Sequence, residues 1–263
     1  LPEFSLAVAT RLVKSFDVNF LGLDRIQHSV EPKITYTHVP YKSQDKLHLF
    51  DLSDRIERRD DITYSLVNRL TSRSTAEDGS QLYREIFNLR LSQSYDIDEA
   101  ENNRSGNDQP FSDVHVELDF RPTRNFSLDV DSLIPAYGDT RFRTLSVGSS
   151  VNDDVGNEFN VHYTYKGEDF VAVATDYIKV QLRTPVLKPV YALFEERYDF
   201  REERELEKVV GLEYRSKCWS LLLTYRNRYQ EDGEDDQQIL LSFILTGLGE
   251  NQGFGNGLVQ IRP

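Results

Sequence analysis

Hydrophobic and polar residues alternate one by one along most of this chain. The clearest segment is 114–120, which reads Val114, His115, Val116, Glu117, Leu118, Asp119 and Phe120. Because successive side chains of a strand point to opposite faces, a period of two predicts a β-strand with one apolar and one polar face. If the strand belongs to a membrane barrel, we expect Val114, Val116, Leu118 and Phe120 to face lipid, and Asp113, His115, Glu117 and Asp119 to face a water-filled interior.

The same alternation predicts further strands at 30–37, 62–71, 87–95, 125–131, 159–165, 210–214, 219–225 and 239–245. The break at Pro122-Thr123-Arg124 separates two such segments and predicts a tight hairpin. We expect about a dozen strands, several of them about 9 to 12 residues long, which is the length that crosses a bilayer at the tilt of a barrel strand.

The predicted strands are joined by connections of two sizes. The short ones are Pro122-Thr123, Lys166–Glu168 and Arg215–Lys217, and the long hydrophilic ones are Lys42–Asp60, Asp96–Pro110 and Glu231–Gln237. Outer-membrane barrels have short periplasmic turns and longer outer loops. The fold class predicted is therefore all-β, an antiparallel up-and-down transmembrane β-barrel. Aromatic residues near predicted strand ends fit interfacial girdles, although aromatics suit any sheet.

Composition excludes some classes of protein and leaves others open. No segment approaches the roughly 18 unbroken apolar residues that a spanning helix needs, which excludes a helical membrane protein. The mean hydropathy of −0.54 does not separate a soluble β-protein from a barrel, whose strands are amphipathic. The formal net charge of −13 argues against a nucleic-acid partner, because phosphate binding depends on a basic surface.

The sequence contains no catalytic constellation, cofactor-binding motif or metal-ligand spacing. The five histidines are scattered, and none belongs to a pattern such as H-E-x-x-H. The loop between His38 and His48 carries Asp45, Asp51 and Asp54, and we interpret it as a solvated polar loop rather than a cation site. The expected function is not enzymatic and needs no cofactor.

Cys218 is the single cysteine and cannot form a disulfide within this chain. Two interpretations stay open: a small buried apolar residue, or a bond to a segment outside this sequence. The sequence begins at Leu1 without an initiator Met or a visible export signal, so we interpret it as a piece of a longer protein.

One family resemblance extends over nearly the whole chain. The segment 28–41 resembles an H-x-x-E-P-x-x-x-Y-x-x-x-P motif through His28, Glu31, Pro32, Tyr36 and Pro40. The segments Pro110–Asp113, Gly211–Tyr214 and Cys218-Trp219 follow in order, and Gly247-Leu248-Gly249 completes the set, with Trp219, Gly247 and Gly249 as its last motif positions. This ordered set is similar to the LptD family of lipopolysaccharide-assembly outer-membrane proteins.

The resemblance implies that residues 1–263 are the C-terminal part of a larger barrel domain in the outer membrane of a Gram-negative bacterium. The N-terminal periplasmic domain and the first strands would then lie upstream. The implied partners are lipopolysaccharide, outer-membrane lipid, a plug lipoprotein of the LptE type and periplasmic transport-bridge proteins. Cys218 is the position to which a disulfide with the upstream domain carries over, although Lys217 stands where some members have a second cysteine.

Two other classes remain open at this point. A porin-like channel or an outer-membrane enzyme shares the strands and aromatic residues but lacks the ordered motif set. A soluble β-sheet binding module would bury the apolar face of its strands in a core, which distinguishes it from both membrane alternatives.

Overall fold

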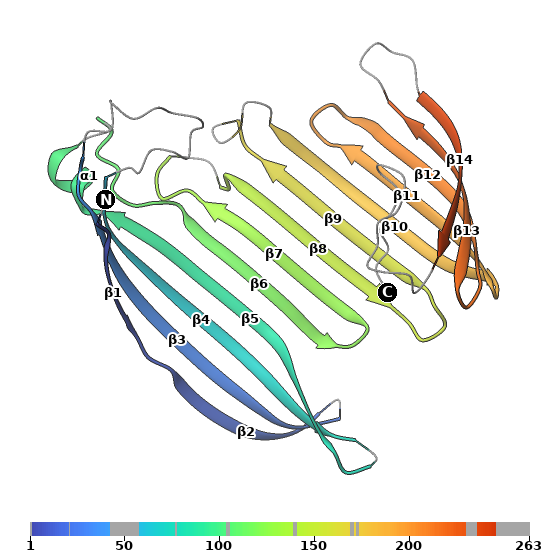
Figure 1. The fold of residues 1–263 in the computed structure, drawn as a ribbon, viewed down its shortest axis with the longest axis horizontal. Helices are drawn as coiled ribbons and strands as arrows, with labels where there is room; N and C mark the ends of the chain where they lie inside the picture. The colour runs from blue at the N-terminus through green and yellow to red at the C-terminus, as the bar shows by residue number, and fades with distance from the viewer. Residues whose placement is uncertain are drawn as a thin grey trace. The chain divides into compact units, whose positions relative to one another are not determined.

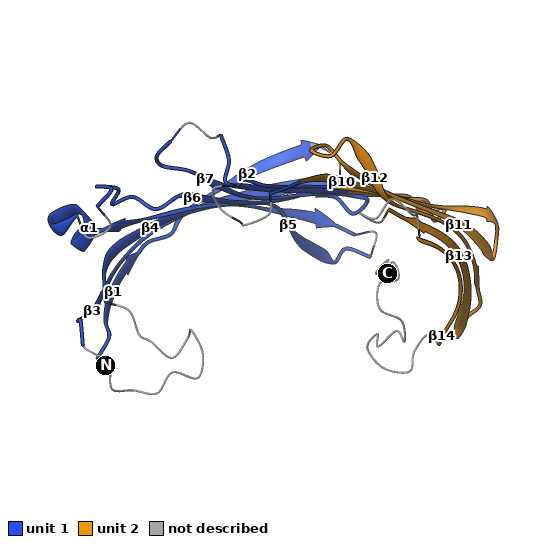
Figure 2. Ribbon diagram, turned by 90° about the horizontal axis from the view of Figure 1, so that it is seen from above, with its two compact units in different colours: residues 1–149, 163–175 blue, residues 150–162, 176–263 orange. Residues whose placement is uncertain are grey.

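The computed structural model describes residues 2–20, 22–42, 58–76, 78–103, 106–138, 141–168, 171, 174–229 and 236–245. Within these residues the chain forms antiparallel β-strands and one short helix (Figure 1). It divides into two compact units (Figure 2). Unit 1 comprises residues 1–149 and 163–175, and unit 2 comprises residues 150–162 and 176–263.

Unit 1 is an up-and-down sheet in which hydrogen-bonded neighbours follow chain order. Its strands are β1 (Phe4–Ala9), β2 (Leu12–Phe20), β3 (Leu23–Val39), β4 (Arg59–Thr75), β5 (Gln81–Asp96), β6 (Val114–Thr123), β7 (Phe126–Ile134), most of β8 (Thr144–Asn152) and the end of β9 (Glu158–Lys166). The order is β1-β3-β4-β5-β6-β7-β8, with β2 also paired to β3. The predicted hairpin of β6 and β7 is confirmed, but its turn lies at residues 124–125 and not at Pro122-Thr123, because both of these residues belong to β6.

Strands β1 and β2 are one strand interrupted opposite Pro32. Ala9 faces Lys33 and Leu12 faces Val30, so the register with β3 is the same on both sides of the interruption. The carbonyl of Pro32 accepts a hydrogen bond from the Thr10 amide at 3.2 Å. Proline has no backbone N–H with which to donate a hydrogen bond in the other direction. The hydrogen-bond ladder between the strands is therefore interrupted at this point.

Unit 2 continues the same antiparallel pattern through the start of β9, then β10 (Thr175–Leu187), β11 (Val190–Asp199), β12 (Arg204–Arg215), β13 (Trp219–Arg228) and β14 (Asp236–Leu245). Among the described residues, β14 has β13 as its one strand neighbour. Within the described residues, β14 is therefore the edge strand of unit 2.

Connections of two sizes are present, and from β2 to β10 they alternate along the chain. The connections 21–22, 76–80, 124–125, 153–157, 188–189 and 216–218 are short, whereas 40–58, 97–113, 135–143, 167–174 and 229–235 are longer. The connection 200–203 between β11 and β12 departs from this alternation, because it is shorter than 76–80. The prediction that Lys166–Glu168 forms a short turn is wrong, because this segment only begins the connection 167–174. The Gly167 amide instead donates to the carbonyl of Arg143 at 2.8 Å, in the connection 135–143.

The connection after β5 contains helix α1 (Ile97–Asn102), which the alternation of residues did not predict. Asp96 caps the helix by accepting a hydrogen bond from the Glu99 amide at 2.9 Å. An Asp followed three residues later by Glu is a helix-start signal, so the sequence did contain a clue. No helix in the described part of the chain is long and apolar enough to span a membrane.

Most of the buried side chains are polar and many hydrophobic side chains are exposed, which is the reverse of a soluble protein. In the described residues, five hydrophobic side chains are buried, against fourteen polar or charged ones. The exposed hydrophobic residues include Leu212, Leu241 and Phe243, at 51%, 68% and 60% of their accessible surface. A soluble sandwich buries its apolar face, so this arrangement contradicts the alternative of a soluble β-sheet module.

Gly211 lies where strands β11, β12 and β13 approach too closely for a side chain. A Cβ at this position would lie 2.9 Å from Thr224 Cγ2 and 3.0 Å from the carbonyl oxygen of Leu223. We expect Gly211→Ala to lower the free energy of unfolding by about 1–3 kcal/mol through overpacking. Urea titration of the protein folded in lipid vesicles measures this change.

The double variant Gly211→Ala with Thr224→Ser is the matched test, since it removes the nearer of the two clashing atoms. Partial recovery in the double variant is expected. Equal stability of Gly211→Ala and the unmodified protein would show that the strands separate at little cost.

Candidate functional site

The candidate functional site comprises the two opposite faces of the sheet, one apolar and one polar. In unit 2 the apolar face extends over four strands. The register places Ala192, Leu212, Leu223 and Leu241 side by side across β11, β12, β13 and β14. Leu212 and Leu223 are about half exposed and Leu241 more so. Four adjacent strands thus present a continuous aliphatic row, exposed on β12, β13 and β14, which suits contact with hydrocarbon rather than water.

The apolar face of unit 1 is built in the same way. One row joins Pro32, Leu66, Leu91 and Val116 across β3, β4, β5 and β6. A second row pairs Leu118 with Leu89 on one side and Val130 on the other. The register confirms that the four apolar residues of segment 114–120 share one face and that His115, Glu117 and Asp119 share the other.

An aromatic cluster marks one end of the apolar face in unit 2. Trp219 lies 5.4 Å from Tyr214 and 5.7 Å from Phe243, measured between ring centroids. The cluster stands beside the short connection 216–218, where an interfacial girdle is expected in a barrel. Cys218 is free and exposed in this connection, so the interpretation as a buried packing residue is wrong.

Glu31 of the H-x-x-E-P motif is the centre of an ion-pair cluster on the polar face of unit 1. Its carboxylate lies 3.1 Å from Arg11 Nε and 3.5 Å from Arg69 Nη1, and it accepts a hydrogen bond from Ser29 Oγ at 3.0 Å. Arg69 Nε also contacts Glu85 at 2.6 Å. The cluster therefore links the β1–β2 junction to β3, β4 and β5.

The other motif residues of this segment are not brought together with Glu31. His28, Pro32 and Tyr36 belong to the opposite face of β3, and Pro40 follows the strand. Tyr36 stacks with His38 and contacts Phe4 edge to face.

Two groups of predicted residues cannot be placed. Gly247 and Gly249 lie outside the described residues, as do Asp45, His48, Asp51 and Asp54 of the predicted polar loop. His38 is described, and its Nδ1 lies 3.6 Å from Asp60.

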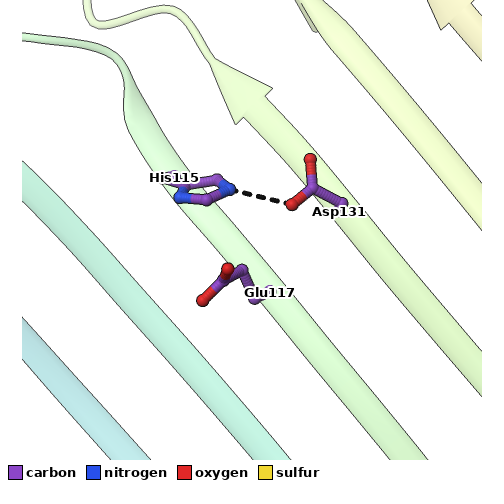
Figure 3. Close-up of side chains that lie close together, drawn as sticks. All are labelled: His115, Glu117 and Asp131. Atoms are coloured by element: carbon purple, nitrogen blue, oxygen red, sulfur yellow. Dashed lines mark hydrogen bonds and ion pairs between the residues drawn. The ribbon is translucent and has the colours of Figure 1, made fainter.

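The polar face of the β6–β7 hairpin carries a row of carboxylates and one imidazole. Arg90 Nη1 donates to Glu117 at 2.9 Å, and His115 Nε2 lies 2.9 Å from Asp131 Oδ2 (Figure 3). Glu117 and Asp131 face each other directly across the two strands. No linear spacing reveals this group, because Asp131 joins it only through the strand register.

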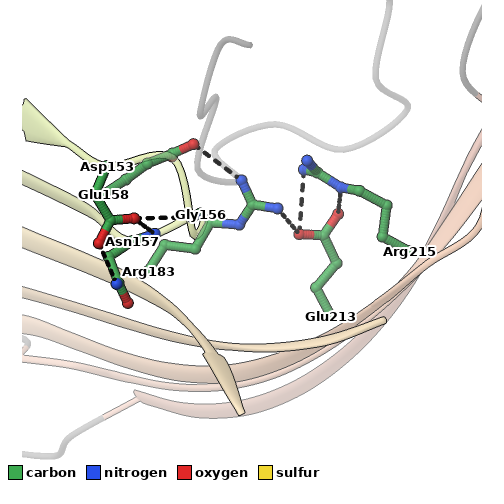
Figure 4. Close-up of polar contacts among 7 residues, drawn as sticks. All are labelled: Asp153, Gly156, Asn157, Glu158, Arg183, Glu213 and Arg215. Atoms are coloured by element: carbon green, nitrogen blue, oxygen red, sulfur yellow. Dashed lines mark hydrogen bonds and ion pairs between the residues drawn. The ribbon is translucent and has the colours of Figure 1, made fainter. Parts of the chain in front are cut away.

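A larger polar network occupies the polar face of unit 2 (Figure 4). Arg183 is 3% exposed, and it lies 3.2 Å from both Glu158 and Glu213. Its guanidinium also stacks over the Tyr191 ring at 4.4 Å, and Arg215 pairs with Glu213 at 3.2 Å. These side chains come from β9, β10, β11 and β12, so four strands share one network.

The turn 153–157 joins the end of β8 to the start of β9 and directly precedes Glu158 of the network. Asp153 accepts hydrogen bonds from the amides of Val155, Gly156 and Asn157, and from the Asn157 side chain. These donors stabilise the ionised carboxylate, with Asn157 as the largest contributor, and they hold the pKa of Asp153 below its usual value. These hydrogen bonds therefore stabilise the folded turn at neutral pH. That stabilisation is lost as the pH falls through the lowered pKa of Asp153.

Each unit thus combines an exposed apolar face with a polar face crossed by ion pairs, and in unit 1 short and longer connections alternate. These features define the wall of an outer-membrane type of β-barrel. The class is set by the arrangement of the faces and does not depend on any single residue.

Comparison with known proteins agrees with this class and specifies the family. The family model LptD, described as LPS transport system D, matches residues 1–183. An LPS-assembly protein LptD of Thiobacillus denitrificans is 24% identical over 95% of this chain and 35% of the relative. Proteins of the same name from Yersinia enterocolitica and Chromobacterium violaceum are each 25% identical, over 86% and 93% of this chain and about a third of their own lengths.

The chain belongs to the LptD family. It spans about a third of the length of the curated relatives that it matches. The resemblance found in the sequence is confirmed, and the antiparallel sheet is part of an outer-membrane β-barrel wall.

Proposed function

We propose that residues 1–263 form the C-terminal part of a barrel that transports lipopolysaccharide and inserts it into the outer leaflet of the outer membrane. The supporting observation is the sheet itself, which exposes hydrophobic side chains on one face and carries ion pairs on the other, in a chain of the LptD family. The relatives that it matches carry the name LPS-assembly protein.

The proposed mechanism breaks no covalent bond. The apolar rows through Leu212 and Leu118 hold the wall in hydrocarbon, while the polar faces line a hydrated path for a sugar-bearing amphiphile. Moving a charged or hydroxylated head group through hydrocarbon is expensive, and a wall that offers water and polar side chains lowers that cost. The upstream part of the protein, a plug lipoprotein of the LptE type and periplasmic bridge proteins complete the proposed assembly.

Depletion of the full-length protein in its own host tests the function. Newly made, pulse-labelled lipopolysaccharide should stop reaching the cell surface and should accumulate inside, and re-expression should restore surface delivery. Normal surface delivery together with altered uptake of small solutes would favour the alternative of a porin-like channel. Neither outcome depends on the stability of an isolated fragment.

We propose that Cys218 forms a disulfide with a segment upstream of residue 1 in the full-length protein. Its exposure in the short connection 216–218 supports accessibility to such a partner. We expect the full-length protein to shift on a non-reducing gel when reductant is added, and we expect Cys218→Ser to abolish the shift. A shift that persists in Cys218→Ser would assign the disulfide to other cysteines.

A further inference from the structure

His115, Glu117 and Asp131 form a compact donor group on the polar face of β6 and β7 (Figure 3). One possible ligand atom from each residue lies within 4.8 Å of the other two, and the pair His115 Nε2 and Asp131 Oδ2 is already 2.9 Å apart. Two ligands of one Zn²⁺ ion are separated by about 3–4 Å, since each bond is about 2.0–2.2 Å long.

The three side chains are open to solvent on this face. His115 and Glu117 are about one third exposed and Asp131 about one half. A hydrated cation can therefore enter without movement of the backbone, and water can fill the remaining coordination positions.

Charge on the hairpin also favours a cation at this position. Neighbouring carboxylates have arginine partners: Asp113 pairs with Arg143, while Asp119 and Asp129 pair with Arg121. Asp131 differs, because its one ion-pair partner in the described part of the chain is the imidazole of His115.

The Arg90 contact is compatible with metal binding. Arg90 donates to Oε2 of Glu117, which fixes the orientation of the carboxylate and leaves Oε1 as the ligand atom. A hydrogen-bonded partner behind a carboxylate ligand is a common outer-shell arrangement in metal sites.

We propose that His115, Glu117 and Asp131 bind one divalent transition-metal cation of the Zn²⁺ class. One imidazole and two carboxylates form a mixed nitrogen and oxygen donor set, which suits Zn²⁺ better than Mg²⁺ or Ca²⁺, because the latter prefer oxygen ligands alone. The cation joins β6 to β7 on their polar face. This inference does not depend on lipopolysaccharide transport.

Calorimetric titration of the chelator-treated full-length protein in detergent with ZnCl₂ tests the proposal. We expect His115→Gln and Asp131→Asn each to weaken Zn²⁺ binding by about tenfold or more. Asp129→Asn is the matched control, because it removes a carboxylate from the same face and strand but leaves the donor group intact. Titration with CaCl₂ should give no binding that depends on His115.

Two further measurements distinguish loss of this metal site from misfolding of a variant and from metal binding elsewhere in the longer protein. Heat-dependent gel mobility establishes that each variant is folded. The visible absorption of bound Co²⁺ should change in His115→Gln, because a nitrogen ligand is lost. The proposal is overturned if His115→Gln binds Zn²⁺ as tightly as the unmodified protein, or if Asp129→Asn loses as much affinity as Asp131→Asn.

Discussion

Arg183→Ala is expected to lower the free energy of unfolding by about 3–5 kcal/mol, the loss typical when one partner of a buried ion pair is removed. Arg183 lies between Glu158 and Glu213, and Glu213 is only 9% exposed, so the substitution leaves a largely buried carboxylate with less compensation. The contact of Arg183 with the Tyr191 ring is lost as well. Urea titration of the full-length protein in lipid vesicles measures the change.

Arg121→Ala is the matched control, because Arg121 also pairs with two carboxylates but is 56% exposed. Exposed pairs contribute at most about 1 kcal/mol, so this variant should be nearly neutral. Arg183→Lys should recover only part of the loss, since an ammonium group lacks the planar fork that reaches two carboxylates. Equal stabilities of Arg183→Ala and Arg121→Ala would mean that water screens the network of unit 2 completely.

Leu118→Arg is expected to lower the stability of the membrane-inserted protein by about 2–4 kcal/mol, the cost of a cationic side chain near the bilayer midplane. Leu118 lies in the middle of β6, in the row between Leu89 and Val130 on the apolar face. Folding measured in vesicles as a function of urea concentration gives this value.

Asn88→Arg places the same side chain at a similar depth on the opposite face. Asn88 pairs with Asp119 across the strands and lies beside Glu85, so a new guanidinium finds carboxylates and water. We expect a change of less than about 1 kcal/mol for this variant. A loss at Asn88→Arg that equals the loss at Leu118→Arg would contradict the assignment of the two faces.

Local sequence pattern predicted most of the fold because strand side chains have a fixed period. The alternation in segment 114–120 assigned each residue to a face, and the β7 partners of residues 117–120 have the matching polarity. The pattern fails at two positions nearer the start of β6, where His115 is opposite Leu133 and Val116 is opposite Ser132. The same reasoning missed α1, because a six-residue helix shows no alternation of hydrophobic and polar residues. Its sequence signal is the capping residue Asp96 at its start. The same reasoning predicted too short a connection after β9, because the length of a connection depends on where the next strand begins to pair.

The candidate site was only partly predictable. The motif around Glu31 was visible as a string of residues, but its meaning came from partners in other strands: Arg11 in the β1–β2 junction and Arg69 in β4. The interruption of the first strand opposite Pro32 likewise needed the pairing of β3. A proline in a strand indicates a missing donor, but not which neighbour loses it.

The sequence by itself determined that this chain forms amphipathic antiparallel strands joined by short and long connections, because the period of two and the turn residues are local properties. It also carried the ordered residues of the LptD family. Only the tertiary structure decided that Arg183 is buried between Glu158 and Glu213, and that His115, Glu117 and Asp131 meet. Those contacts depend on register, and a shift of one residue would move every side chain of a strand to the other face.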